Sequence, residues 1–508
     1  MKRIFVLGLA ILIFISGCTL PSILTSSEQT TSFISDSYIS DTSQTIVSTL
    51  NENTIENSEY DNSDDSSSKN ISDATPQTST SDNESKSSST ATSDNSSESL
   101  STTSSEISST TEKFEYSTAR TDNIYPNQIY FTPIGTYEKL YYKNLDAKTQ
   151  AVYRYIDDAI FEMRTGYIDL YNCTDSQVFL AFNAVRHDRP EYYWMPNAYL
   201  YDKNNMKLGI AIESEDSTDY LCTEEQREIY DRQIKSALED LNLHLSSNIS
   251  EYERELAVHD WLVNRVTYDL NVANEYQTSG TTTQNPFAFS SYGALVKKGN
   301  TAKAVCEGYS RALQLALNYV GIECGLVNGE YSGGSHMWNV VKIDNYWYHV
   351  DATGDDTSDR GFHLFLNTST EFILNTHTID PDFSTVNPNY NNVSSNYNLP
   401  QCNSMKYNYL TINKQVLMDK DQMENIVIAA LINVANSGKT YCEFGFSEDS
   451  PYYYTNDRNS DIYIDKLIDL SYCKKTANKS LSTDQQISVF SYIGIQGCKG
   501  FLLSWEKT

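Results

Sequence analysis

A cysteine, a histidine and an aspartate near the middle of the chain have the types and settings of the reacting groups in a thiol enzyme. Cys306 opens a segment whose apolar residues recur at helical spacing and which stops at Gly321. The first turn of a helix has unpaired backbone N–H groups and the positive end of the helix dipole, and both stabilise a thiolate. We therefore expect Cys306 to be a nucleophile, with Gly308 keeping the same turn open to a substrate.

The expected partners of Cys306 lie in a β-hairpin over residues 335–351. A two-residue turn at 344–345 fixes the register of its strands. Because side chains alternate between the faces of a strand, this register makes His336 and Asp351 diagonal neighbours on one face. The carboxylate then orients the imidazole and favours its protonated form, which keeps the cysteine as a thiolate. Each residue alone has an ordinary structural explanation, but the joint pattern favours a catalytic triad.

The segments before the triad have mixed helix and strand patterns, which indicates an α+β fold. Thr223 with Gln226, and Ser250 with Glu253, have the spacing of capping boxes that begin helices. His259 lies beside the apolar stripe of the second of these helices, and we interpret it as a packing residue rather than a catalytic one. Helices are expected over 146–163, 175–185 and 223–244, and strands over 198–201 and 207–212.

The residues after Pro400 predict a small α/β accessory domain in which no motif indicates chemistry. Strand-like and helical patterns alternate there. Strands are expected over 407–412, 440–446, 487–493 and 500–505, and helices over 419–434 and 462–473.

The N-terminal 115 residues differ in composition from the rest. Lys2 and Arg3 precede an apolar run over 4–15 that is too short to span a bilayer, which indicates a secretory signal. Of the 97 residues from Thr19 to Glu115, 47 are Ser or Thr. So little apolar surface cannot offset the entropy of ordering the chain, which predicts a disordered tether.

The charge of the chain excludes one class of function. It has 37 basic and 67 acidic residues, for a formal net charge of −30. Binding to phosphate groups depends on clustered Lys and Arg, so we expect no nucleic-acid partner.

Residues 246–385 resemble the transglutaminase-like superfamily, whose core is related to papain. The resemblance implies an antiparallel sheet packed on a helix that begins at the catalytic cysteine. It implies that Cys306 is the nucleophile, that His336 is general base and acid, and that Asp351 orients the histidine. The matching motifs occur in order, and they are His259-Asp260-Trp261-Leu262 with Tyr268-Asp269, Tyr292-Gly293-Ala294-Leu295-Val296, Ala304-Val305-Cys306-Glu307-Gly308-Tyr309-Ser310-Arg311-Ala312, His336-Met337-Trp338-Asn339 and His349-Val350-Asp351-Ala352-Thr353.

Two further positions follow from this resemblance. Tyr292 belongs to a segment that runs beside the catalytic cleft in this family, so its hydroxyl is a candidate to help the backbone N–H of Cys306 hold an oxyanion. A packed aromatic residue is the alternative. Such proteins often have Trp after the last motif, where this chain has Gly354, so we expect an aromatic wall to be missing near the site.

The sequence Ile15-Ser16-Gly17-Cys18 resembles the bacterial lipobox. The resemblance implies cleavage before Cys18 and lipidation of that cysteine. The protein would then be anchored at the extracellular face of a bacterial membrane. An ordinary signal peptide is the alternative.

No cofactor is expected, although an acidic run could hold calcium as some transglutaminases do. The ligand spacing of an EF-hand is absent, so a solvated loop is the preferred interpretation. No CxxC or HExxH motif indicates a zinc site. The acidic residues are Asp351, Asp355, Asp356 and Asp359.

Seven cysteines remain besides Cys18 and Cys306. Cys324 is expected to be buried packing. The other six could form disulfides within their own regions in an oxidising compartment, or stay free, and both alternatives remain open. They are Cys173, Cys222, Cys402, Cys442, Cys473 and Cys498.

Together these observations predict five regions. They are a lipoprotein signal peptide (1–17), a disordered tether (18–116), an α+β lead-in domain (117–245), a transglutaminase-like catalytic domain (246–400) and a small α/β accessory domain (401–508). The first hypothesis for function is a cell-surface thiol enzyme that attacks Gln side-chain or peptide amides of a protein or peptide substrate and forms a thioester. Its outcome would be cross-linking, deamidation or proteolysis. The alternative is a non-catalytic binding or adhesion module on the same fold, which the intact triad disfavours.

Overall fold

The computed structural model describes residues 38–40, 139–170, 173–196, 198–202, 207–210, 220–279, 284–331, 333–356, 363–380, 399–495 and 497–507. The predicted signal peptide and Cys18 lie outside these residues, as does the predicted tether apart from Tyr38–Ser40. Those three residues form the strand β1, which pairs in parallel with β3 (Ala198–Asp202). The signal peptide, the lipid anchor and the tether therefore stay predictions.

The lead-in region combines helices with a sheet of strand order β1-β3-β4-β2. The helix α2 (Ala147–Phe161) begins where the carboxylate of Asp146 accepts the amide protons of two residues in the first turn. The helix α3 (Asp175–Asp188) begins at a capping box of Thr174 and Gln177. The remaining elements are η1 (Tyr142–Asn144), β2 (Gly166–Asp169) and β4 (Lys207–Ile210).

Both predicted capping boxes are present. The hydroxyl of Thr223 accepts the amide proton of Gln226, whose side chain accepts that of Thr223, and α4 (Glu224–Leu243) begins there. Ser250 and Glu253 make the same pair of bonds at the start of α5 (Glu251–Val263). The expected starts of these two helices are therefore confirmed.

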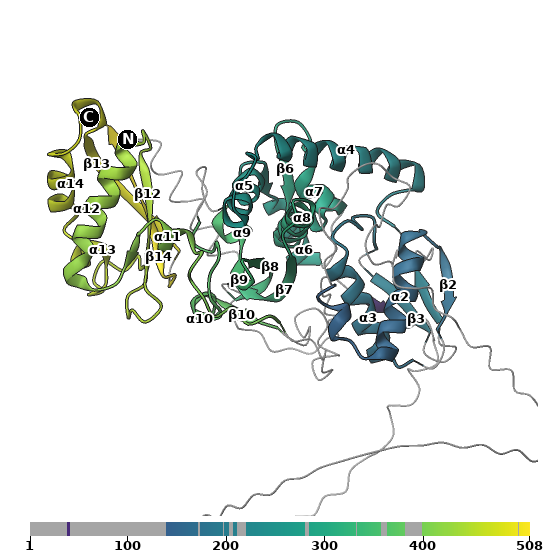
Figure 1. Ribbon diagram of the computed structural model, residues 1–508. Helices are drawn as coiled ribbons and strands as arrows, with labels where there is room; N and C mark the ends of the chain where they lie inside the picture. Colours follow the sequence, from purple (N-terminus) through teal and green to yellow (C-terminus); the bar gives the residue numbers. More distant parts are fainter. Residues whose placement is uncertain are drawn as a thin grey trace, which may run out of the picture. The chain divides into compact units, whose positions relative to one another are not determined.

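The predicted triad lies where a helix packs on an antiparallel sheet of order β10-β7-β8-β9 (Figure 1). The helix α8 begins at Cys306, as expected. It ends in a Schellman motif, in which Gly321 takes a φ of 87° and the amide of Ile322 donates to the carbonyl of Leu317 (2.8 Å). The bounds are α8 (Cys306–Tyr319), β7 (Cys324–Tyr331), β8 (Gly334–Ile343), β9 (Tyr346–Val350) and β10 (His377–Ile379).

Shorter elements complete this domain. The strands β5 (Val266–Tyr268) and β6 (Ala302–Ala304) pair in parallel just before α8. The others are α6 (Leu270–Ser279), η2 (Pro286–Phe289), α7 (Ser291–Leu295), α9 (Ala352–Asp355) and α10 (Thr370–Ile373).

The predicted hairpin and its register are confirmed. The pairing runs from Ile343 opposite Tyr346 at the turn to Asn339 opposite Val350. The turn residues Asp344 and Asn345 both have positive φ, 47° and 67°, as a two-residue turn that matches the strand twist requires.

The C-terminal region is a four-stranded sheet of order β11-β12-β14-β13 with the helices α12 and α14 packed together. Three of the four expected strands and one of the two expected helices are present near their predicted bounds. The elements are α11 (Tyr409–Ile412), β11 (Val416–Leu417), α12 (Lys420–Asn436), β12 (Tyr441–Phe446), α13 (Ile464–Leu467), α14 (Leu470–Asn478), η4 (Thr483–Gln485), β13 (Ile487–Gly494) and β14 (Gly500–Lys507).

Two of the expected C-terminal elements are wrong. The strand expected over 407–412 is instead the short helix α11, because the side chain of Asn408 accepts amide protons from its first turn. The helix expected over 462–473 is interrupted, because Asp469 caps a new helix by accepting the amide proton of Tyr472.

One hydrophobic core runs through the lead-in and the region predicted to be the catalytic domain. It includes Phe179 of α3, Leu313 of α8 and Val340 of β8. A second core lies within the C-terminal sheet and its helices. The chain thus has an α+β fold. Among the helices in the described ranges, none combines the length and apolarity needed to cross a membrane.

A buried ion-pair network joins α3 to the first turn of α8. Arg186 donates to Oε1 of Glu307 (2.8 Å), and the same oxygen accepts from Arg311 (2.6 Å). Arg311 also donates to the backbone carbonyl of Arg186. The lead-in therefore contributes directly to the position of the helix that carries the predicted nucleophile.

Candidate active site

Cys306 is half-buried at the first position of α8. The hydroxyl of Ser310, one turn along, lies 2.9 Å from the carbonyl oxygen of Cys306 and 2.8 Å from that of Met337 on β8. The side chain of Asn339, also on β8, donates to the carbonyl of Ser310 (2.9 Å). These contacts hold the start of α8 against the strand that carries His336.

The expected role of Gly308 is wrong, because this residue faces packed backbone rather than open space. A Cβ atom there would lie 2.3 Å from the carbonyl oxygen of Ala288 and 2.8 Å from Cβ of Ala304. Gly308 therefore allows α8 to approach the segment before it closely.

His336 links the predicted nucleophile to the predicted orienter. Its Nε2 lies 2.9 Å from Oδ2 of Asp351, which leaves Nδ1 as the ring nitrogen for the thiol of Cys306. Burial lowers the pKa of His336, but the charge and hydrogen bond of Asp351, with a smaller contribution from Cys306, outweigh it and raise the pKa to about 10. The imidazole is therefore a cation at neutral pH and a proton donor beside the thiol.

Asp351 is buried and receives three donors. Its Oδ1 accepts the amide proton of Thr353 (3.1 Å), and its Oδ2 lies close to His336 and to Nε2 of His377 (3.2 Å). Burial favours the neutral acid, but the two histidines outweigh it and hold the pKa of Asp351 well below its usual range. The carboxylate is thus fixed in its ionised form.

His377 is a member of this site that the sequence did not indicate. It is buried, and its ring stacks on that of Tyr331 with centroids 4.5 Å apart. Burial lowers its pKa despite the bond to Asp351, so the ring is neutral. The hydroxyl of Thr376 lies 2.9 Å from its Nδ1, which leaves Nε2 to donate its proton to Asp351.

Strand pairing explains why His377 was missed. The strand β10 pairs His377 with Tyr331, and β7 pairs Gly329 with His336. Since Gly329 and Tyr331 are two residues apart, both histidines lie on one face of the sheet. The three-residue strand β10 has no local pattern that would reveal this pairing from the sequence.

An aromatic ring borders the triad even though Gly354 stands where a tryptophan was expected. A Cβ atom on Gly354 would lie 2.6 Å from Oδ2 of Asp351 and 2.8 Å from the ring of Phe365. The buried Phe365 lies edge-on to His377, with centroids 5.3 Å apart. The expectation of a missing aromatic wall is therefore corrected, because another segment supplies a ring.

Tyr292 is not brought to the triad through its hydroxyl. That hydroxyl donates to Oε1 of Gln233 on α4 (2.6 Å). The ring packs against Phe287, Tyr230 and Tyr193. The structure thus favours the packed-aromatic alternative over an oxyanion role.

The acidic run does not point to one ion among the described residues. Asp351 faces two histidines, Oδ2 of Asp355 lies 3.2 Å from Nε2 of His259, and Oδ2 of Asp356 accepts from the hydroxyl of Tyr309 (2.5 Å). Asp359 lies outside the described residues. Calcium stays an untested possibility, and the preferred interpretation as a solvated loop is wrong for Asp351 and Asp355, which are buried.

Of the eight described cysteines, Cys222, Cys402, Cys442, Cys473 and Cys498 are free thiols, which is the second of the two alternatives. Burial raises the pKa of Cys222, Cys402 and Cys473 to about 12, which keeps these thiols protonated and unreactive. Cys324 is buried, as expected. Cys306 is the one half-buried thiol among the eight.

Residues 243–352 match the model of the transglutaminase-like superfamily. This segment is similar to a transglutaminase-like domain, and it contains Cys306, His336 and Asp351. It ends before His377, whose place in the site comes from the structure alone.

Two curated relatives are named Kyphoscoliosis peptidase. The protein of Mus musculus is 28% identical over 159 residues, which are 28% of this chain and 22% of the relative. That of Homo sapiens is 26% identical over 198 residues, or 36% and 27% of the two chains. The match thus spans about a quarter of the length of these relatives.

Two solved structures are also similar to part of the chain. One is described as a TGase, with 25% identity, a TM-score of 0.23 and coverage of 26% of this chain and 34% of that one. The other is a proposed cysteine protease from Cytophaga hutchinsonii, with 22% identity, a TM-score of 0.18 and coverage of 24% and 37%.

Proposed function

We propose that this chain is a thiol enzyme that acts on Gln side-chain or peptide amides through Cys306, His336 and Asp351. The observation that carries the proposal is the 2.9 Å contact between His336 and Asp351, with Nδ1 of the same imidazole left for a half-buried thiol at the start of α8. In this arrangement Cys306 would be the nucleophile, His336 the base, and Asp351 the residue that orients His336.

The first half of the reaction would form a thioester. Sγ of Cys306 attacks the amide carbon, and the carbonyl oxygen takes the negative charge. The backbone N–H of Cys306, at the first position of α8, would donate to that oxygen. The C–N bond then breaks, and His336 gives its proton to the leaving nitrogen.

The second half would release the acyl group. A water molecule or an amine attacks the thioester carbon, His336 takes the proton of the attacking group, and the bond between carbon and sulfur breaks. Water as the acceptor gives proteolysis or deamidation, whereas a lysine amine gives a cross-link. The curated relatives are named peptidases, which supports a peptide amide as substrate.

The proposed location is the extracellular face of a bacterial membrane, with lipidated Cys18 as the anchor. The apolar run and the lipobox-like residues before Cys18 support this location. The wild-type protein should fractionate with membranes, and Cys18→Ala should be released or kept as precursor. Wild-type protein found only in the medium would contradict the anchor.

Covalent labelling tests the thiol mechanism. A peptide with a diazoketone in place of its glutamine amide should alkylate one cysteine with loss of dinitrogen, and peptide mass mapping should place the adduct on Cys306. The buried thiols of Cys324 and Cys402 are internal controls and should stay unlabelled. Binding of the peptide without an adduct, in wild type and Cys306→Ala alike, would favour the non-catalytic binding module.

A further inference from the structure

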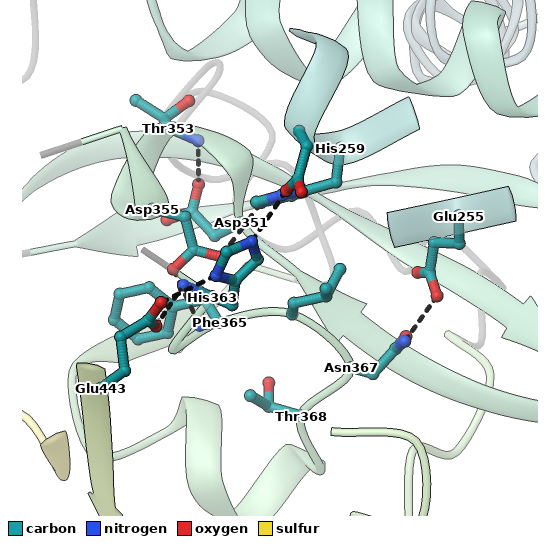
Figure 2. Close-up of polar contacts among 12 residues, drawn as sticks. Glu255, His259, Asp351, Thr353, Asp355, His363, Phe365, Asn367, Thr368 and Glu443 are labelled. Carbon is teal, nitrogen blue, oxygen red and sulfur yellow. Dashed lines mark hydrogen bonds and ion pairs between the residues drawn. The ribbon is translucent and has the colours of Figure 1, made fainter. Parts of the chain in front are cut away.

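A second cluster of histidine and carboxylate side chains lies at the end of α9 that is away from Asp351 (Figure 2). Its members come from α5, from α9, from the loop after α9 and from the C-terminal strand β12. They are His259, Asp260, Asp355, His363 and Glu443.

Three potential ligand atoms converge at the centre of this cluster. Nδ1 of His259 lies 3.2 Å from Oδ1 of Asp260, and Nε2 of His363 lies 2.8 Å from the same oxygen. All three atoms lie within 4.8 Å of one another. The side chain of Asp260 is 45% exposed, whereas those of His259 and His363 are 1% and 13% exposed, so the cluster meets solvent on the side of Asp260.

The outward ring nitrogens of both histidines face buried carboxylates. Nε2 of His259 lies 3.2 Å from Oδ2 of Asp355, and Nδ1 of His363 lies 2.8 Å from Oε1 of Glu443. The other oxygen of Glu443 accepts the backbone amide proton of His363 (2.7 Å). A histidine that binds a metal typically donates its second N–H to a carboxylate, as Nδ1 of His363 can to Glu443, and such a bond fixes the tautomer and the ring orientation.

We propose that His259, Asp260 and His363 bind one first-row divalent cation, with Zn²⁺ as the best fit. Two imidazoles and one carboxylate suit Zn²⁺, whereas Ca²⁺ takes oxygen ligands. Zinc bonds of about 2.0–2.1 Å separate tetrahedral ligand atoms by roughly 3.3 Å. The 3.2 Å contact of His259 with Asp260 already has this spacing, and the 2.8 Å contact of His363 with Asp260 must widen. Water fills the remaining position.

The sequence could not indicate this site. His259 and Asp260 are adjacent on α5, and His363 follows about a hundred residues later, so no short motif joins the ligands. The carboxylate beside Nδ1 of His363 is that of Glu443, on β12 of the C-terminal sheet.

Metal binding is measured best in the Cys306→Ala background of the full chain, because zinc also binds thiols. After treatment with a chelator and addition of ZnCl₂, elemental analysis of the dialysed protein should give about one zinc per chain. Titration calorimetry should show that His259→Asn and His363→Asn each weaken binding about 100-fold or more, and Glu443→Gln about 10- to 100-fold. The matched control His244→Gln, at an exposed histidine bonded to the carbonyl of Asp240, should leave the affinity unchanged.

X-ray absorption at the zinc edge gives a second measurement that needs no ligand variant. It should find two imidazoles with oxygen neighbours and no sulfur. Zinc at well under one equivalent, sulfur in the coordination shell, or unchanged affinity in both histidine variants would each overturn the proposal. Each of these outcomes is independent of whether Cys306 is alkylated, so failure here and failure of the thiol mechanism are distinguishable.

Discussion

Two clusters of histidines and carboxylates lie at the two ends of α9 and differ in what their imidazoles face. At the start of the helix, one carboxylate, that of Asp351, lies close to both His336 and His377, and the second ring nitrogen of His336 is left for Cys306. At the end of the helix, beside Asp355, both ring nitrogens of each histidine face a carboxylate. The first cluster thus leaves one ring nitrogen beside a nucleophile, whereas in the second cluster every ring nitrogen lies beside a carboxylate.

This difference shows that the same residue types give different chemistry depending on whether the second ring nitrogen of the histidine faces a carboxylate or a thiol. An imidazole with carboxylates on both sides is fixed and has no position left for a reacting proton. An imidazole with one carboxylate and one thiol can move a proton between the thiol, the leaving group and the acceptor. Substitutions of the residues in and around the first cluster test this interpretation.

Removal of the reacting groups should have the largest effect. Cys306→Ala should abolish adduct formation and lower turnover roughly 10⁴-fold or more, and His336→Ala should come close, because the leaving amine loses its proton donor. Steady-state kinetics and thermal melting measure the two effects. The control Cys402→Ala, at a buried thiol that contacts Pro400, should keep its turnover. Wild-type turnover in Cys306→Ala would make the thiol mechanism wrong.

Asp351→Asn should lower turnover by roughly 10²-fold and change the pH profile. The negative charge of Asp351 is the main cause that raises the pKa of His336 to about 10. Without that charge the pKa falls, so His336 loses its acidic proton at lower pH. The alkaline limb of kcat/KM should therefore move from near pH 10 toward neutrality. An alkaline limb that stays in place would show that Asp351 does not set the protonation of His336.

Gly354→Ala should damage the first cluster without removing any of its groups. The added Cβ would lie 2.6 Å from Oδ2 of Asp351, so the carboxylate or Phe365 must move. Overpacking of this kind costs about 1–3 kcal/mol of unfolding free energy, and chemical denaturation measures it. Turnover should fall as well. The control Gly438→Ala, at an exposed turn with positive φ, should lose stability only.

His377→Phe should have a smaller effect, because it removes one donor to Asp351 and keeps an aromatic ring in place. The lost bond to a charged group, about 1.5 kcal/mol, corresponds to roughly a tenfold fall in kcat. His377→Gln, which can donate from a similar position, should restore most of the rate. If both variants lost activity equally, the role of His377 would be packing rather than orientation of the carboxylate.

Tyr292→Phe should have the smallest effect on turnover, because Tyr292 does not belong to the reacting cluster. Its hydroxyl donates a hydrogen bond to Gln233, so turnover should stay within about twofold of wild type. Loss of that hydrogen bond should lower the free energy of unfolding by about 1 kcal/mol. A large fall in kcat with normal stability would restore the oxyanion role.

The parts of the site that the sequence predicted are those set by local structure. The two-residue turn fixes the register between β8 and β9, so His336 and Asp351 could be placed together from spacing alone. An apolar stripe that stops at Gly321 likewise located α8. His377 and Glu443 could not be found in this way, because each reaches its partner through pairing or packing of segments far apart in the chain.

The errors in the fold have a related cause. Residues 407–412 have the aromatic and β-branched composition of a strand, and a single side chain, Asn408, turns them into a helix. The apolar pattern over 462–473 predicted one continuous helix, but Asp469 caps a new helix within it. In both places a short polar residue that hydrogen-bonds the backbone outweighs the average preference of its neighbours.

The contact between Arg186 and Glu307 limits which part of the chain can be moved into another protein without loss of stability. The family-matched segment, 243–352, carries Glu307 but leaves Arg186 behind. A copy cut at those bounds would lose one cation from a buried pair, a change that typically costs about 3–5 kcal/mol. It would also lose His377. The smallest unit that recombination could move intact is therefore larger than the recognisable family segment, because it must bring the lead-in helix α3 with the nucleophile.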